Sequence, residues 1–171
     1  MELTPQIGND LQKACDEKIA EIYQRLYTNE PNYGVSLDCF KTSVNSTLCR
    51  FIAASDARPS DREILTFLDQ LQSEDLYLAL ACAAGNERAW WDFDREHRSF
   101  MQRVARQLAR TEVDAEEIIG VVYEQLYGTR IVDGQRQSKF SSYSGRGNLR
   151  GWLRTVIWHS LVDRHRAGHD E

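Results

Sequence analysis

Apolar residues recur every three or four positions along most of the chain, which is the period of an amphipathic α-helix. The pattern predicts seven helices, over residues 9–28, 36–54, 61–71, 73–85, 86–110, 113–127 and 148–166. Ser60 and Glu63 have the spacing of a capping box at the start of the third helix, and Asn148 is a suitable N-cap for the last. No stretch sustains the two-residue alternation of a half-buried strand. We therefore expect an all-α helical bundle.

The composition is typical of a folded protein and argues against disordered, collagen-like and membrane-spanning chains. Apolar residues make up 42% of the chain and charged residues 27%, with only three prolines. The longest apolar or small-residue run, Leu78–Ala84, is far shorter than the roughly 20 residues of a membrane helix. The N-terminus lacks the basic-then-apolar order of a secretory signal. We therefore expect a cytoplasmic protein without membrane contact.

Cysteine and histidine residues do not form a recognisable metal or disulfide pattern. The four cysteines lack a Cys-x-x-Cys pair, and the one helical histidine pair, His165 and His169, is interrupted by Gly168. The adjacent acids Glu116 and Glu117 diverge by about 100° on a helix, which is unsuited to joint acid–base catalysis. The sequence therefore predicts reduced, mostly buried thiols, no metal, no other cofactor and no enzymatic activity.

Charge is distributed in bands along the chain. The net charge of −5 argues against a protein that coats nucleic acid by bulk electrostatics. Met1–Asp75 carries 7 basic and 13 acidic residues, whereas Leu76–Glu171 carries 14 and 13. Within the second half, residues 95–110 hold five arginines, residues 111–129 hold five acids without a basic residue, and residues 130–166 hold eight basic residues. This banding predicts two faces for two different partners.

Residues 140–154 mix aromatic residues, glycines and arginines. Arginines follow phosphates, aromatic rings stack on bases at roughly 1–3 kcal/mol each, and glycines allow close approach, so the mixture suits unpaired nucleic acid. A stripe of the last predicted helix continues this chemistry with Arg150, Arg154, Trp158, Leu161 and His165. The same residues are also compatible with a solvated helix face and a packed core, because arginines are usually solvated and tryptophans are usually largely buried.

Four motifs follow one another within residues 73–167. They are Glu74-Asp75-Leu76-Tyr77, Gly85-Asn86-Glu87-Arg88-Ala89-Trp90, Asp114-Ala115-Glu116-Glu117-Ile118 and Tyr143-x-Gly145-x-Gly147-x-Leu149-x-x-Trp152-Leu153. In this order and spacing, over about 95 of 171 residues, the region resembles domain two of bacterial RNA polymerase sigma factors of the extracytoplasmic-function group. The resemblance implies a helical domain that binds the polymerase core and recognises and melts the minus-ten promoter element.

The resemblance also implies two sets of site residues. The acidic helix would dock on the clamp helices of the polymerase largest subunit through Glu116, Glu117, Val121, Tyr123 and Glu124. The loop and last helix would contact promoter DNA, mainly the single non-template strand, through Tyr143, Arg146, Asn148, Arg150, Trp152, Arg154, Trp158, His159 and Arg164. Within this set, the position of Tyr143 is that of a loop residue that captures a flipped base.

Two questions stay open at the level of sequence. Residues 1–72 lie outside the resemblance, and their acidity fits a DNA mimic that covers the basic face, a supporting helical layer, or a docking site for a regulator such as an anti-sigma factor. Gly120-Val121 stands where many sigma factors carry Gln and an acid, and this favours a second function, a sigma-like adaptor or decoy that does not read DNA. The chain shows no second helical domain for the minus-thirty-five element, so we expect a fragment or a protein that works with help.

Overall fold

The computed structural model describes residues 7–29 and 31–169, and within these it contains seven α-helices. They are α1 (Asn9–Thr28), α2 (Leu37–Ala54), α3 (Asp61–Gln70), α4 (Ser73–Ala83), α5 (Glu87–Leu108), α6 (Glu112–Tyr127) and α7 (Leu149–His169). Every predicted helix is present, with its ends within a few residues of the predicted positions, and the all-α fold is confirmed. Among the described residues, no helix has both the length and the apolar character of a bilayer span.

Local caps begin the helices where the sequence predicts them. At α3 the Ser60 hydroxyl accepts a hydrogen bond from the Glu63 amide at 3.2 Å, and the Glu63 carboxylate accepts one from the Ser60 amide at 2.6 Å. At α7 the Asn148 side chain accepts a hydrogen bond from the Gly151 amide at 2.8 Å. These caps satisfy amides that have no partner inside the helix, and both predicted caps are confirmed.

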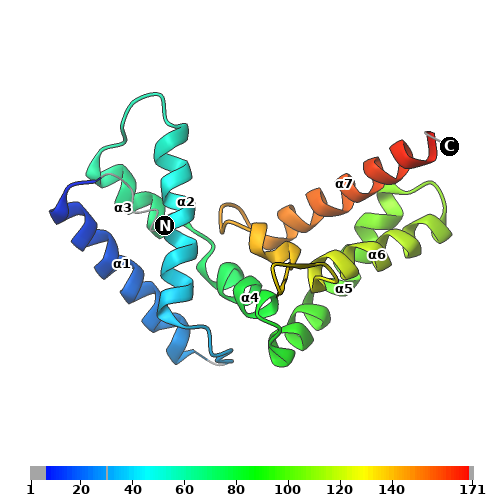
Figure 1. Ribbon diagram of the computed structural model, residues 1–171, viewed down its shortest axis with the longest axis horizontal. Coiled ribbons are helices and arrows are strands. Elements are labelled where there is room, and N and C mark those ends of the chain that lie inside the picture. Colours follow the sequence, from blue (N-terminus) through cyan, green and yellow to red (C-terminus); the bar gives the residue numbers. More distant parts are fainter. Residues whose placement is uncertain (1–6, 30, 170–171) are drawn as a thin grey trace.

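Two groups of helices share α4 (Figure 1). Helices α1–α3 pack together on one side of α4, and α5–α7 pack on the other. We call residues 7–72 the N-terminal unit and residues 87–169 the C-terminal unit. Leu76, Ala79 and Cys82 of α4 are fully or almost fully buried, so α4 supplies core to both units.

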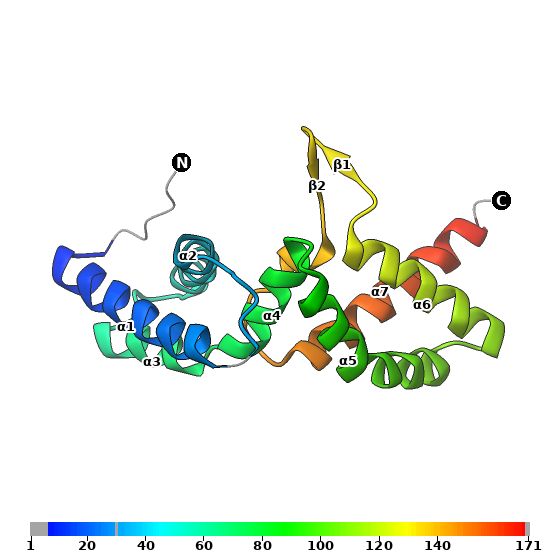
Figure 2. The same cartoon turned by 90° about the horizontal axis from the view of Figure 1, so that it is seen from below.

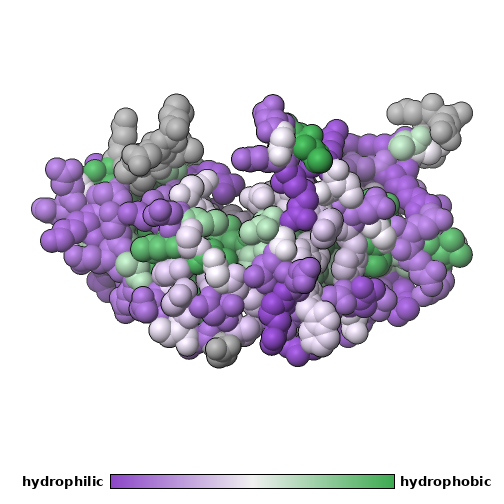
Figure 3. Space-filling model, turned by 60° about the horizontal axis from the view of Figure 1, so that its bottom comes forward, coloured by the Kyte–Doolittle hydropathy of each residue, from purple (hydrophilic) through white to green (hydrophobic). Residues whose placement is uncertain are grey.

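The segment between α6 and α7 is more ordered than the predicted loop. It contains a short antiparallel hairpin, β1 (Ile131–Val132) and β2 (Gln135–Arg136), followed by the 3₁₀ helix η1 (Lys139–Ser142). Asp133 and Gly134 have φ angles of 52° and 76°, and such positive values at both central positions suit a tight hairpin turn. The hairpin projects from the helices (Figure 2), and Figure 3 shows it as mostly hydrophilic with a hydrophobic spot near its tip. Ile131 and Val132 of β1 are exposed.

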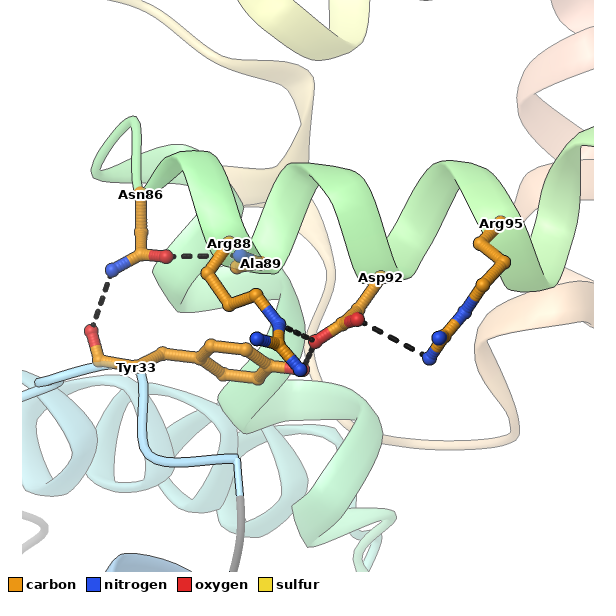
Figure 4. Close-up of polar contacts among 6 residues, drawn as sticks. All are labelled: Tyr33, Asn86, Arg88, Ala89, Asp92 and Arg95. Carbon is orange, nitrogen blue, oxygen red and sulfur yellow. Dashed lines mark hydrogen bonds and ion pairs between the residues drawn. The ribbon is translucent and has the colours of Figure 1, made fainter.

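A buried carboxylate joins the two units. The Tyr33 hydroxyl, from the segment between α1 and α2, donates a hydrogen bond of 2.8 Å to Asp92 of α5. Arg88 and Arg95 contact the same carboxylate at 3.1 Å and 3.2 Å, and the Asn86 side chain donates to the Tyr33 carbonyl at 3.0 Å (Figure 4). The Asp92 side chain is only 8% exposed, so these partners replace the water that it loses on folding.

The same contacts set the proton affinity of Asp92. Burial by itself raises the pKa, but the hydrogen bonds from Tyr33 and Arg88 outweigh burial and hold the pKa of Asp92 below its ordinary value of 3.8. Because the folded state holds this proton less tightly than the unfolded state, Asp92 contributes stability above pH 3.8. That contribution is lost as the pH falls through the lower, folded-state value.

Tyr33→Phe tests this junction. Removing the hydroxyl leaves a buried carboxylate short of one donor, so we expect a loss of about 2 kcal/mol in the free energy of unfolding, measured by urea denaturation at neutral pH. The loss should shrink as the pH falls below 3.8. Tyr27→Phe is the matched control, because the Tyr27 side chain is exposed and its hydroxyl has no hydrogen bond to a described residue. Equal stabilities of the two variants would contradict this role of Tyr33.

Candidate nucleic-acid interface

The packing of α7 determines which of its side chains face outward. Leu149, Leu153, Val156 and Ile157 are buried against the other helices of the C-terminal unit. The helical repeat then places Arg150, Arg154 and Trp158, each four residues apart, along one exposed edge. Leu161, which the sequence predicts on this stripe, is only 4% exposed and belongs to the core, because its direction falls on the apolar side of the helix.

A contact from α4 fixes the start of α7. The Leu149 amide donates a hydrogen bond of 2.8 Å to the Asp75 carboxylate. A negative side chain at a helix N-terminus is also favoured by the helix dipole. Asn148, predicted to contact DNA, instead caps the helix through the Gly151 amide. Asp75 and Asn148 together hold the first turn of α7, and with it Arg150, in a fixed position.

Aromatic and basic side chains from α5 and α7 meet beside this edge. The guanidinium groups of Arg150 and Arg103 lie 5.1 Å and 5.9 Å from the ring centroid of Phe100. A guanidinium nitrogen of Arg154 lies 3.5 Å from the side-chain oxygen of Gln107. We call Phe100, Arg103, Arg150, Arg154 and Trp158 the basic–aromatic face.

The charges of the basic–aromatic face are not neutralised within the described part of the chain. Arg103, Arg150 and Arg154 form no ion pair with any described residue, whereas Arg88, Arg95, Arg98 and Arg106 of α5 each contact an acid. Trp158 is 50% exposed. Three available guanidinium groups and one accessible indole ring are the groups that bind phosphates and stack on bases.

Phe100 and Arg103 are absent from the residues that the sequence predicts to bind DNA. Both come from α5, more than forty residues before Arg150 in the chain. Their spacing of three residues places them on one side of α5, and this is the only local sequence pattern that indicates that they act together. Their meeting with Arg150 depends on the packing of α5 against α7, and no local sequence pattern encodes that contact.

Of two residues predicted to contact DNA, Tyr143 lies in the core, and Trp152 is partly buried and packs against the core. Tyr143 is 3% exposed, its hydroxyl donates to the Gly147 carbonyl at 2.7 Å, and its ring packs on Trp152 with centroids 5.5 Å apart. Trp152 also stacks on Phe140. Burial raises the pKa of Tyr143 above its ordinary value. The loop satisfies the hydroxyl internally, so the ring is not presented to a base.

The N-terminal unit holds the loop that contains Tyr143. The Thr47 hydroxyl donates to the Ser144 carbonyl at 2.9 Å, and the Gln72 amide donates to the Gly145 carbonyl at 2.8 Å. Arg146, predicted to bind DNA, places its guanidinium 5.8 Å and 5.3 Å from the ring centroids of Phe51 and Phe67. These contacts hold the loop against the N-terminal unit, and the Arg146 side chain lies beside that unit.

His159 and Arg164 also lie apart from the basic–aromatic face. His159 lines a cavity of about 950 Å³ between the hairpin and the last two helices, together with Asp163. Arg164 contacts the carboxylates of Glu117 and, at 3.6 Å, Asp114. Arg164 and Glu117, which the resemblance assigns to two different partners, therefore bind each other.

The predicted polymerase-binding residues lie on α6. Glu116, Glu117, Val121 and Glu124 are exposed. Tyr123 is half-buried, donates a hydrogen bond of 2.7 Å to Asp94, and lies under the Arg98 guanidinium. Burial, followed by the hydrogen bond to Asp94, raises the pKa of Tyr123. Tyr123 thus helps to join α6 to α5, and the exposed acids and Val121 form the accessible part of this helix.

Known proteins add no further identification. Comparisons of the chain with protein-family models, curated proteins and solved structures find no match. The two faces described above, one basic and aromatic and one acidic, are therefore the features from which a function is inferred.

The pKa of His97 depends on the position of Arg150. It is 3% exposed and its Nδ1 atom has no hydrogen-bond partner among the described residues. Burial lowers the pKa of His97 below its ordinary value of 6.5, and the charge of Arg150 lowers it further, against the opposing effect of Glu96.

Arg150→Ala should therefore raise the pKa of His97, because one nearby positive charge is removed. An NMR titration of the histidine ring protons measures this value. Arg154→Ala removes the same charge farther along α7 and should leave the pKa of His97 unchanged. Identical His97 titration curves for the two variants would show that Arg150 does not lie where the structure has it.

Proposed function

We propose that this chain is a sigma-factor-like module that binds the RNA polymerase core and recognises and melts the minus-ten promoter element, in the cytoplasm. The observation that carries the proposal is the basic–aromatic face, with three guanidinium groups free of acidic partners beside the exposed ring of Trp158. Cations and a stacking ring together suit single-stranded DNA better than duplex DNA, in which the faces of the bases are covered.

The distribution of charge supports a division of labour between the two faces. Phosphates would follow Arg103, Arg150 and Arg154, and a base would stack on Trp158. The exposed acids of α6 would repel the same strand and would instead bind basic groups on the clamp helices of the polymerase largest subunit. One chain would in this way connect the polymerase to the strand that it opens.

The module would act by binding energy alone. Pulling a base out of the duplex costs a few kcal/mol, which stacking and phosphate contacts to the separated strand offset. Capture of that base by Tyr143 would also require the loop around Ser144 and Gly145 to leave its hydrogen bonds with Thr47 and Gln72. No bond is made or broken by the chain, and synthesis belongs to the polymerase.

The burial of Tyr143 favours a second function. A sigma-like adaptor or decoy would hold the polymerase, or a regulator, without reading DNA, and such a protein needs no exposed base-capturing ring. A transcription assay separates the two functions. Promoter opening by polymerase core together with this chain supports the first, whereas retention of core on the immobilised chain without promoter opening supports the second.

Single substitutions on the basic–aromatic face should weaken binding to a short single-stranded oligonucleotide. We expect Arg154→Ala and Trp158→Ala each to lower the affinity about tenfold, measured by fluorescence anisotropy. Arg154→Ala removes a phosphate contact, so it should also reduce the dependence of affinity on salt. Trp158→Ala removes stacking and should leave the salt dependence unchanged.

Arg25→Ala on α1 is the matched control, because it removes the same charge from an exposed helix of the N-terminal unit. It should bind the oligonucleotide as the unaltered chain does. If Arg25→Ala and Arg154→Ala weaken binding equally, the affinity reflects overall charge, and the basic–aromatic face is not the binding site.

A further inference from the structure

Helices α5 and α6 enclose a groove of about 540 Å³ on the surface of the C-terminal unit. Ala115, Ile119 and Gly120 of α6 supply its small and apolar lining. Ala115 and Ile119 are themselves buried, so the groove reaches the edge of the core. A groove of this kind accepts an apolar side chain better than a charged one.

Gly120 lies near the middle of α6, where glycine is unfavourable. Glycine in a helix interior destabilises a protein relative to alanine. Gly120 has no positive φ that would call for glycine, it is exposed, and a Cβ atom added there would meet nothing within 4 Å. Nothing among the described residues therefore requires glycine at this position, and the space beside it is open to a partner.

The charges around Gly120 specify the partner. Glu116 lines the groove, and Glu124 lies beyond its lining, four residues after Gly120 on the same side of α6; both are exposed and neither forms an ion pair with a described residue. On the opposite rim, Arg98 and Arg106 are already paired at 2.8 Å with Asp94 and Glu112. The charge that remains uncompensated on this side of α6, in the groove and just beyond it, is therefore negative.

We propose that Gly120 opens a slot for one aliphatic side chain of a partner helix that carries Lys or Arg four residues before and four residues after it. The aliphatic side chain enters over Ile119, and the two flanking cations meet Glu116 and Glu124. Helices that pack side by side match positions at this spacing, and the missing Cβ of Gly120 lets the partner backbone approach closely. Nucleic acid is disfavoured as the occupant because its phosphates would face the two acids.

The proposal rests on the proposed function in one respect only, the identity of the partner helix, which would be one of the clamp helices of the polymerase. The chemistry of the slot is specified by the chain itself. A synthetic helical peptide with a single leucine flanked by arginines at the i−4 and i+4 positions is therefore a suitable probe, beside the polymerase core. The same peptide with alanine in place of leucine is its control.

Substitution of Gly120 separates the stability of the chain from its binding of the peptide. Gly120→Ala should raise the melting temperature by about 3 °C, because alanine favours the helix and meets no neighbour. Gly120→Leu fills the groove and should weaken binding of the leucine peptide at least tenfold, with a smaller loss for Gly120→Ala. Gly168→Ala in α7, another exposed helical glycine with open space around its α-carbon, should leave peptide binding unchanged.

The peptide-binding measurements decide whether Gly120 opens a slot. Loss of peptide binding in Gly120→Leu, with the folded state retained in the melting curve, supports the slot. Unchanged binding in both Gly120 variants, or equal binding of the leucine and alanine peptides, overturns it. Absence of peptide binding to the unaltered chain also overturns it. If the unaltered chain binds the peptide in a Gly120-dependent manner but does not bind polymerase core, the slot stands and the proposed polymerase partner is wrong.

Discussion

The packing of α7 against α5 and α6 determines which side chains of the C-terminal unit reach its surface. Leu149, Leu153 and Ile157 bury one side of α7, and the Asp75 carboxylate holds its first amide. A rotation of α7 by one residue, about 100°, would expose this apolar side and bury charged groups, at a cost of several kcal/mol. The outward direction of Arg154 and Trp158 is therefore a consequence of the core, and the basic–aromatic face needs no ligand to assemble it.

The same core also fixes the loop that contains Tyr143 and Arg146. Gly145 has a φ of 81°, and a Cβ atom there would come within 3.3 Å of Leu76, so glycine lets the loop turn close to α4. With the loop in this position, Tyr143 faces inward and Arg146 contacts the N-terminal unit. Residues 7–72 thus act on the candidate interface through the loop, although none of them belongs to the basic–aromatic face.

Sequence reasoning succeeded where the determinants are local. The seven helices follow from apolar periodicity, and the caps at Ser60 and Asn148 follow from side chains within one turn of their targets. The hairpin does not follow from alternation, because two-residue strands are too short to alternate, although Asp133-Gly134 is a turn signal that indicates it.

Long-range contacts explain why several residues that the sequence predicts to bind DNA lie away from the basic–aromatic face. Tyr143 is buried, Arg164 pairs with Glu117 across two helices, and His159 faces the cavity beside the hairpin. Each outcome depends on which helices pack together, and a stripe drawn on a single helix does not contain that information. The contact of Phe100 with Arg150 has the same origin, so the interface gains residues from α5 and loses others from the loop.

The most direct test of the basic–aromatic face is the indole N–H signal of each tryptophan in an NMR titration with single-stranded DNA. Trp158 and Trp91 are both exposed, on different helices, so they serve as internal controls for one another. If the basic–aromatic face binds the DNA, the Trp158 signal shifts in proportion to bound DNA while the Trp91 signal stays in place. A shift of Trp91 with a stationary Trp158, at saturating DNA, would contradict it.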